Sequence, residues 1–232
     1  MPRITSTGHC ALCGETFSKR AISRHLITCQ VAHPPKKGKL RKTFRLLVEG
    51  RGLSEYWLHL EAPADATLRI LDSFLRDIWL ECCGHLSAFT IENARYELDT
   101  GGVDAMWTEI FGTREQPQSM NVRLEAVLRP DLKFYHEYDF GTTTALALKV
   151  VSEEMRPFES KTVRLLARNL PPPILCAKCG QPATQVCVEC MYTEKGWLCE
   201  AHGEKHPHQD MFLPVVNSPR VGMCGYTGPF ED

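Results

Sequence analysis

The 232-residue sequence contains no run of eighteen apolar residues, so it predicts no membrane-spanning helix. No apolar stretch follows the basic start of the N-terminus, and a secretory signal peptide is therefore not expected. Without such a signal, the eleven cysteines are not expected to form a disulfide framework. They are expected to bind metal in a reducing compartment, which predicts a cytoplasmic protein.

Acidic residues are scarce only at the N-terminal end of the chain. Residues 1–45 carry ten Lys and Arg against one acid, a net charge of +9. Residues 46–170 carry thirteen against twenty (−7), and residues 171–232 carry four against seven (−3). A basic arm on an acidic body predicts an anionic partner at the N-terminal end. The alternative is a solvated charged tail that binds nothing in particular.

Proline-rich and lysine-rich stretches divide the chain into segments. Residues 31–42 combine Pro and Lys and are expected to form a linker that does not pack, and three consecutive prolines stand at 171–173. The predicted segments are a CCHC-type zinc finger at 1–30, a basic linker at 31–42, an α+β domain at 43–168, a zinc cross-brace module at 169–210 and a glycine-containing tail at 211–232.

The middle segment has the apolar periodicity of a folded core. Residues 44–49 and 56–61 read as two strands around a glycine turn at 50–52. A helix is expected from an N-cap at Asp65, with apolar residues at three- and four-residue steps from Leu68 to Cys82. Further strands are expected at 86–91, 95–98, 122–128, 133–139 and 144–151. This order predicts an α+β fold with a mainly antiparallel sheet and one principal helix, in a β-grasp-like arrangement.

The N-terminal segment has the ligand spacing of a zinc finger. Cys10, Cys13, His25 and Cys29 follow the pattern C-x2-C-x11-H-x3-C, in which the last two ligands lie on one face of a helix. Basic residues on that helix and behind it are expected to contact phosphates of a nucleic acid. These residues are Lys19, Arg20, Arg24, Lys36, Lys37, Lys39, Arg41 and Lys42.

The C-terminal cluster offers eight metal ligands in four pairs. In a cross-brace the first and third pairs share one zinc ion, and the second and fourth share another. The first set is Cys176, Cys179, Cys199 and His202, and the second set is Cys187, Cys190, His206 and His208. This pattern resembles a B-box or MYND-type module, although the one-residue gap in the last pair leaves a single-zinc arrangement as an alternative.

Saturated ligand sets favour structural over catalytic zinc. A module of this kind is expected to present a rigid surface to a protein partner. With the finger, the chain is expected to hold about three zinc ions.

The body offers a weaker candidate site. His85, Glu137 and Asp139 are candidate residues for a metal-dependent hydrolase or a nucleic-acid-processing factor, and the favoured alternative is that Asp139 ends a strand by bonding backbone amides. Cys82 and Cys83 are expected to be buried, inert thiols. Cys224 receives no role.

The middle segment also resembles a bacterial family, the plasmid pRiA4b ORF-3-like (TnpR-like) domain. The resemblance lies in residues 42–60, in the helix at 68–80 with the following Gly-His-Leu-Ser-Ala-Phe, and in Tyr-His-Glu-Tyr-Asp-Phe-Gly at 135–141. It implies the fold and a setting in mobile elements. Residues 142–145 depart from the family, which has acidic residues and a Trp there.

Together these patterns predict a non-enzymatic zinc-binding interaction protein. Its finger is expected to contact nucleic acid and its C-terminal module a protein. The alternatives are the hydrolase above and a purely structural adaptor.

Overall fold

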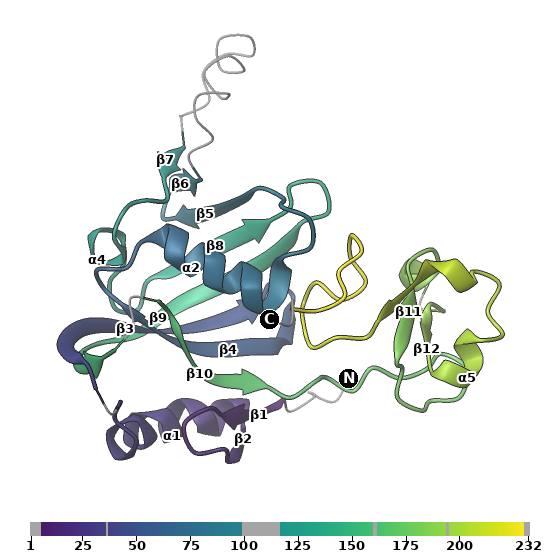
Figure 1. The fold of residues 1–232 in the computed structure, drawn as a ribbon, viewed down its shortest axis with the longest axis horizontal. Helices are drawn as coiled ribbons and strands as arrows, with labels where there is room; N and C mark the ends of the chain where they lie inside the picture. Colours follow the sequence, from purple (N-terminus) through teal and green to yellow (C-terminus); the bar gives the residue numbers. More distant parts are fainter. Residues whose placement is uncertain (1–5, 36, 99–116, 160–161, 194, 230–232) are drawn as a thin grey trace, which may run out of the picture.

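A ten-stranded mixed sheet forms the centre of the molecule (Figure 1). The computed structural model describes residues 6–35, 37–98, 117–159, 162–193 and 195–229. The strand order is β2-β1-β10-β4-β3-β9-β8-β5-β6-β7, and each neighbouring pair is antiparallel except β6 and β7. The strands are β1 (Thr7–Cys10), β2 (Thr16–Ser18), β3 (Lys39–Gly50), β4 (Leu53–Pro63), β5 (Ser87–Ile91), β6 (Ala94–Glu97), β7 (Gln118–Ser119), β8 (Lys133–Tyr138), β9 (Thr144–Phe158) and β10 (Arg164–Asn169).

The helices are short. They are α1 (Lys19–Ala32), α2 (Leu68–Leu75), which continues as the π-helical turn η1 (Arg76–Leu80), α4 (Leu124–Val127) and α5 (Glu200–Gly203), with 3-10 turns η2 (Met191–Thr193) and η3 (Gln209–Met211). Helix α2 lies across one face of the sheet (Figure 1) and buries Leu68, Leu71 and Leu75 in the main core. Its N-cap is Thr67, whose hydroxyl accepts a hydrogen bond from the amide of Ile70 at 3.3 Å, and not Asp65 as expected.

The expected architecture, an α+β fold with one principal helix in a β-grasp-like arrangement, is wrong. The sheet extends over ten strands because the finger strands β1 and β2 join it through β10, which the sequence did not reveal as a strand. The longest helix is α1 of the finger, with 14 residues, whereas α2 has 8. The finger and the body therefore share one sheet.

Individual elements agree better with the sequence. The β3–β4 hairpin around Gly52 is confirmed, and β5, β6 and β8 are confirmed to within one residue at each end. The strand expected at 144–151 is also present, but it is longer, since β9 runs to Phe158. The strand expected at 122–128 is wrong, since Leu124–Val127 form the short helix α4. Residues 31 and 32 of the expected linker belong to α1, and residues 39–42 belong to β3 and pair with β9, so only the part between them connects finger and body.

The C-terminal module has a separate small sheet, ordered β12-β11-β13, and lies to one side of the main sheet (Figure 1). Its strands are β11 (Gln185–Cys187), β12 (Trp197–Leu198) and β13 (Phe212–Pro214). The chain after β13 then returns to the body. There Ser218 donates a hydrogen bond from its hydroxyl to the carbonyl oxygen of Trp79 at 2.6 Å, and Arg220 is fully buried.

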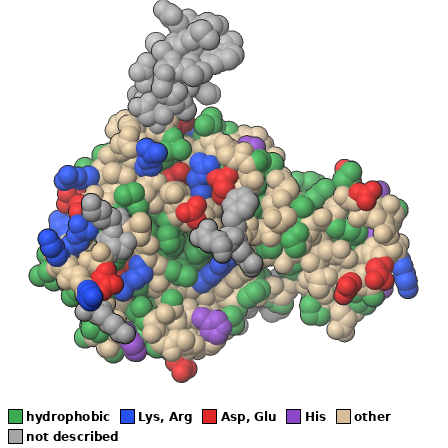
Figure 2. All heavy atoms as spheres, in the orientation of Figure 1, with side chains coloured by type: hydrophobic (Ala, Val, Ile, Leu, Met, Phe, Trp, Pro, Cys, Tyr) green, Lys and Arg blue, Asp and Glu red, His purple; other side chains and the backbone are tan. Residues whose placement is uncertain are grey.

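Charged and apolar side chains are mixed over the visible surface (Figure 2). Basic and acidic groups intermingle over the body, where Arg41 pairs with Asp65 and Lys42 with Glu153. Apolar side chains gather where the body meets the C-terminal module (Figure 2). No helix in the described part of the chain is long and apolar enough to cross a membrane.

Candidate metal centres

Four groups of Cys and His side chains could each hold a metal ion. Within each group the four ligand atoms lie within 4.8 Å of one another. A zinc–sulfur bond of about 2.3 Å places two thiolates of one tetrahedral site about 3.8 Å apart, so these separations suit a tetrahedral ion. The groups are Cys10, Cys13, His25 and Cys29; Cys176, Cys179, Cys199 and His202; Cys187, Cys190, His206 and His208; and Cys82, Cys83, His85 and Cys224.

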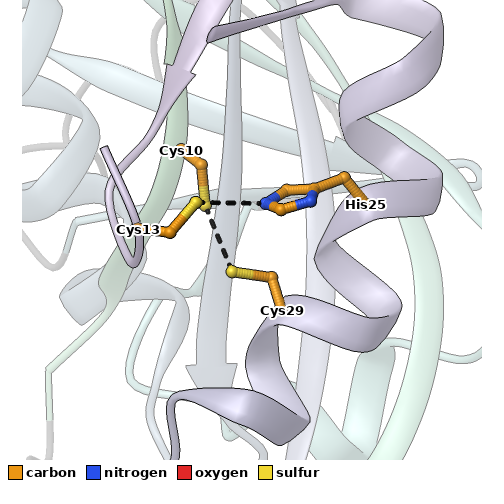
Figure 3. Close-up of side chains that lie close together, drawn as sticks. All are labelled: Cys10, Cys13, His25 and Cys29. Carbon is orange, nitrogen blue, oxygen red and sulfur yellow. Dashed lines mark hydrogen bonds between the residues drawn. The ribbon is translucent and has the colours of Figure 1, made fainter. Parts of the chain in front are cut away.

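The finger group is held by β1 and α1 (Figure 3). Cys10 ends β1 and Cys13 stands in the turn that follows, whereas His25 and Cys29 lie one turn apart on α1. The Sγ atoms of Cys10 and Cys29 are 3.7 Å apart, and Cys13 Sγ is 3.4 Å from His25 Nε2. All four side chains thus point to one centre, as the spacing predicts for a finger.

The finger packs onto the sheet. Ile22 and Leu26 of α1 are fully buried and share a core with Trp57 of β4 and Leu166 of β10. The N-cap of the helix is Ser18, whose hydroxyl accepts a hydrogen bond from the amide of Ala21 at 3.3 Å. The two ligands on α1, His25 and Cys29, are therefore held in place by the packing of the helix as well as by any bound metal.

The Cys29 thiol of the finger is buried and close enough to its neighbours to oppose its own ionisation. Burial, followed by the neighbouring Cys10 and Cys13 thiols, raises the pKa of Cys29 to about 12. A divalent cation between them would reverse this effect, since it stabilises thiolates directly. The donor set therefore fits a metal ion better than free thiols.

The first group of the C-terminal module joins the start and the middle of that module. His202 Nδ1 lies 3.2 Å from Cys199 Sγ and 3.6 Å from Cys176 Sγ, and the Sγ atoms of Cys179 and Cys199 are 3.8 Å apart. Burial acts to raise the pKa of Cys176, but backbone amides that bond its sulfur, those of Cys199 and Lys178 among them, lower this pKa to about 6. This thiol is thus prepared for ionisation, as metal binding requires.

The second group of the C-terminal module includes both of the closely spaced histidines, His206 and His208. His208 Nδ1 lies 3.4 Å from Cys190 Sγ and 3.7 Å from Cys187 Sγ. His206 belongs to the same group, and its Nε2 is buried without a hydrogen-bond partner among the described residues. The structure separates the eight ligands into the two sets that a cross-brace requires, so the one-residue gap does not keep either histidine out.

The fourth group was not found from the sequence. His85 Nε2 lies 3.1 Å from Cys83 Sγ and 3.2 Å from Cys224 Sγ, and Cys83 Sγ lies 3.4 Å from Cys82 Sγ and 3.8 Å from Cys224 Sγ. The expectation that Cys82 and Cys83 are buried, inert thiols is wrong, because Cys83 is exposed and Cys82 only partly buried. Cys224 lies 139 residues from His85 along the chain, so the spacing of ligands in the sequence does not predict this group.

Of the three candidate catalytic residues of the body, two come together and the third does not. His85 Nε2 lies 3.5 Å from Asp139 Oδ2, but Glu137 lies on the opposite face of β8 from Tyr138 and pairs with Arg95 at 3.4 Å. Asp139 accepts hydrogen bonds from the amides of Gly141 and Thr142, which is the strand-ending role considered as the alternative.

Asp139 also pairs with Arg220 at 2.7 Å. Burial of Asp139 opposes ionisation, but the Arg220 guanidinium and these amides together lower its pKa. Asp139 is therefore an ionised structural group.

The basic residues fall into two groups. Lys19 pairs with Glu49, Arg41 with Asp65 and Lys42 with Glu153, so these cations are engaged within the chain. Arg20, Arg24, Lys37 and Lys39 are exposed. Lys36 lies outside the described residues.

Comparisons with known proteins add little to this picture. No family model and no curated protein matches the sequence. One solved structure that matches in part is the crystal structure of a protein of unknown function, MM3350, from Methanosarcina mazei Go1. It shares 15% sequence identity and has a TM-score of 0.45, covering 62% of this chain and 77% of its own.

Proposed function

We propose that the chain is a non-enzymatic zinc-binding interaction protein, which contacts nucleic acid through the finger and a protein partner through the C-terminal module. The observation that carries the proposal is the closure of the finger group and of both C-terminal groups, each with four ligand atoms around one centre. Four protein ligands leave no open position for a substrate or an activated water. Such sites stabilise a fold rather than perform chemistry.

Zinc is the ion that these donor sets favour. Cysteine thiolates and histidine nitrogens select zinc over magnesium or calcium, which prefer oxygen ligands. Zinc also needs no change of oxidation state to hold a small domain together. We therefore assign zinc to the finger and to both sites of the module.

The outer face of α1 is the surface we assign to nucleic acid. Arg20 and Arg24 are exposed one turn apart, and neither has an ion-pair partner within the described ranges. Both line a surface hollow of about 610 Å³ together with Phe17 and Thr28. Free guanidinium groups beside an aromatic ring are suited to phosphate and base contacts. Lys37, also exposed, lies between the end of α1 and the start of β3, and the exposed Lys39 is the first residue of β3.

The C-terminal module is the surface we assign to a protein partner. It exposes Tyr192 by 74% and Leu175 by 55%, and Met211 is also exposed. Aromatic and methionine side chains of this kind are enriched at protein interfaces. A zinc-braced module would hold them in fixed positions without a large core.

The mobile-element setting implied by the pRiA4b ORF-3-like resemblance belongs to the same proposal. A protein that binds both nucleic acid and another protein suits such a setting. The metal-dependent hydrolase is not part of the proposal, since Glu137 pairs with Arg95 and lies on the opposite face of β8 from Tyr138, whose ring contacts His85.

A binding experiment tests the nucleic-acid assignment. The double variant Arg20→Glu/Arg24→Glu is compared with Arg51→Glu/Arg69→Glu, which makes the same charge change at two exposed positions of the body. Affinity for a short single-stranded or duplex oligonucleotide at low salt should fall about tenfold or more in the first variant, with a shallower salt dependence. The control should stay near the original chain.

Equal affinity in both variants would contradict the assignment. Elemental analysis of the same preparations should find at least about three zinc ions per chain, and fewer would contradict the structural scheme.

A further inference from the structure

The fourth group of ligands lies where the C-terminal tail meets the body. Cys82, Cys83 and His85 follow η1, and Cys224 is supplied by the tail after the chain has passed through the C-terminal module. We propose that these four residues bind a further zinc ion, and that this ion is exchangeable and fastens the tail to the body. The proposal does not depend on the nucleic-acid or protein contacts proposed above.

The separations in this group match those of the other three groups. The Cys83–Cys224 Sγ distance of 3.8 Å equals the Cys179–Cys199 distance, and both suit a tetrahedral zinc ion. The His85 Nε2 contacts to sulfur, 3.1 and 3.2 Å, are close to the 3.2 Å contact between His202 and Cys199. Three sulfurs and one imidazole nitrogen form a Cys3His set, the same donor set as in the finger and in the first C-terminal group.

The backbone at these cysteines resembles that at the other sites. Cys13 and Cys179 are each followed by a glycine with positive φ, 79° at Gly14 and 71° at Gly180. In the fourth group, Cys83 and Cys224 are followed by Gly84 at 78° and Gly225 at 70°. A Cβ at any of these four glycines would meet nothing within 4 Å, so the backbone angle rather than space explains the glycine. The same Cys-Gly turn therefore recurs at this group.

Cys224 itself is held in an uncommon conformation. Its φ of 46° is in the left-handed region, which costs a non-glycine residue of the order of 1 kcal/mol or more. Such conformations persist where the surrounding structure maintains them, and they are found at ligand-holding positions as well as in turns. Here the conformation accompanies a Cys224 Sγ that lies among the other ligands.

A buried arginine contacts one of the cysteines of this group. Arg220 is fully buried, and its Nη2 donates to Cys82 Sγ at 3.4 Å and to Asp139 Oδ2 at 2.7 Å. A charge-assisted hydrogen bond to sulfur favours the thiolate, the form in which cysteine binds metal. Tyr138 completes this layer, since its ring lies under the Arg220 guanidinium at 4.8 Å and its hydroxyl accepts from the amide of His85 at 3.3 Å.

Solvent exposure distinguishes this group from the others. Each of the other three groups includes at least one buried cysteine, whereas here Cys83 and Cys224 are exposed and Cys82 and His85 are partly buried. A chelator or a competing thiol can therefore reach this ion directly. The expected behaviour is rapid exchange at one site while the other three ions exchange slowly.

Metal counting on the full-length chain tests the proposal. Native mass spectrometry in the presence of reductant should show about four zinc ions on the original chain and about three on Cys224→Ser and on Cys83→Ser. Thr227→Ala, a change at an exposed tail position outside the group, is the control and should keep about four. A chromogenic chelator should remove about one ion in a fast phase from the original chain and from Thr227→Ala, and that phase should be missing in both cysteine variants.

Two results would overturn the site. One is a count of three in the original chain that does not change in either cysteine variant, which would leave the proposed function standing. The other is the loss of more than one ion in both cysteine variants, because the proposal makes this site separate from the other three. Far-ultraviolet circular dichroism of each variant establishes that the count is taken on folded protein.

Discussion

The finger and the C-terminal module bind metal through similar Cys and His sets, but the rest of the protein supports them to different degrees. The finger strand β1 pairs with β10 of the large sheet, and α1 buries Ile22 and Leu26 against Trp57. The module has three strands of two or three residues each. Its fully buried apolar side chains are few, chiefly Val186 and Leu198.

This difference indicates how much each region depends on metal. A unit that is too small to bury a sufficient core needs metal to fold, and its binding free energy then becomes folding free energy. The module fits that description. The finger gains additional stability from strand pairing and from a shared core. Metal binding should therefore contribute a smaller part of its folding free energy than it does in the module.

The largest effect is expected from removing one ligand of the module. Cys187→Ser should unfold residues 176–214 locally, because the second metal set is broken and the small core cannot compensate. Limited proteolysis should then cut within the module and leave the sheet intact. The matched change in the finger, Cys13→Ser, should leave β1 and α1 much less sensitive to protease. Equal sensitivity in both regions would contradict the comparison.

The next effect concerns the core that the finger shares with the body. Leu26→Ala removes a fully buried side chain and should lower the free energy of unfolding by about 2–5 kcal/mol. Ile27→Ala, on the exposed side of the same helix, should change it by less than about 0.5 kcal/mol. Urea unfolding measures both. If Leu26→Ala lowered the free energy of unfolding as little as Ile27→Ala, the shared core would not stabilise the finger.

The contact between finger and body should also be sensitive to acid. Burial, assisted by Arg45 and Lys19, lowers the pKa of His59 to about 4, and His59 Nε2 lies 3.1 Å from the Ser23 hydroxyl of α1. Since the unfolded chain takes up a proton near pH 6.5 and the folded chain only near pH 4, stability falls as the pH drops through that range. The loss should reach about 3 kcal/mol.

His59→Gln isolates this contribution, because glutamine does not titrate. Zinc ligands also take up protons in acid, but they do so in both chains, so the difference between the two unfolding curves belongs to His59. Curves that fall in parallel from pH 7 to pH 4 would show that His59 is not the cause.

The smallest effect is expected at the start of α1. Ser18→Ala removes the hydroxyl that accepts from the Ala21 amide and should cost about 1 kcal/mol. Ser18→Asp restores an acceptor and should recover most of this loss. Thermal unfolding of the zinc-loaded protein distinguishes the two variants, and equal melting temperatures would rule out a capping role.

The features that could be predicted from the sequence are those formed by residues close together in the chain. The finger and module ligands were found because each Cys-x2-Cys pair and each histidine lies close to its partners in the chain, and the β3–β4 hairpin was found from its glycine turn. The joining of β1 to β10 was not found, because it pairs residues about 160 positions apart, such as Gly8 with Asn169. The helix α4 was missed because four residues with alternating apolar character also suit one helical turn.

The fourth metal group was also missed because its residues lie far apart in the sequence, although a local signal was present. Of the eleven cysteines, four are followed directly by glycine: Cys13, Cys83, Cys179 and Cys224. Two of these belong to sites recognised by spacing, and the other two belong to the fourth group. The shared dipeptide would have pointed to Cys83 and Cys224 as ligands, but only the fold shows that they meet.

Hydrogen exchange followed by mass spectrometry, with and without a strong zinc chelator, tests the comparison most directly. Removal of metal should abolish amide protection across β11, β12 and α5, and should leave β1 and the buried side of α1 partly protected through their contacts with β10 and Trp57. Equal loss of protection in the finger and the module would contradict the account. So would a module that stays protected after all zinc has been removed.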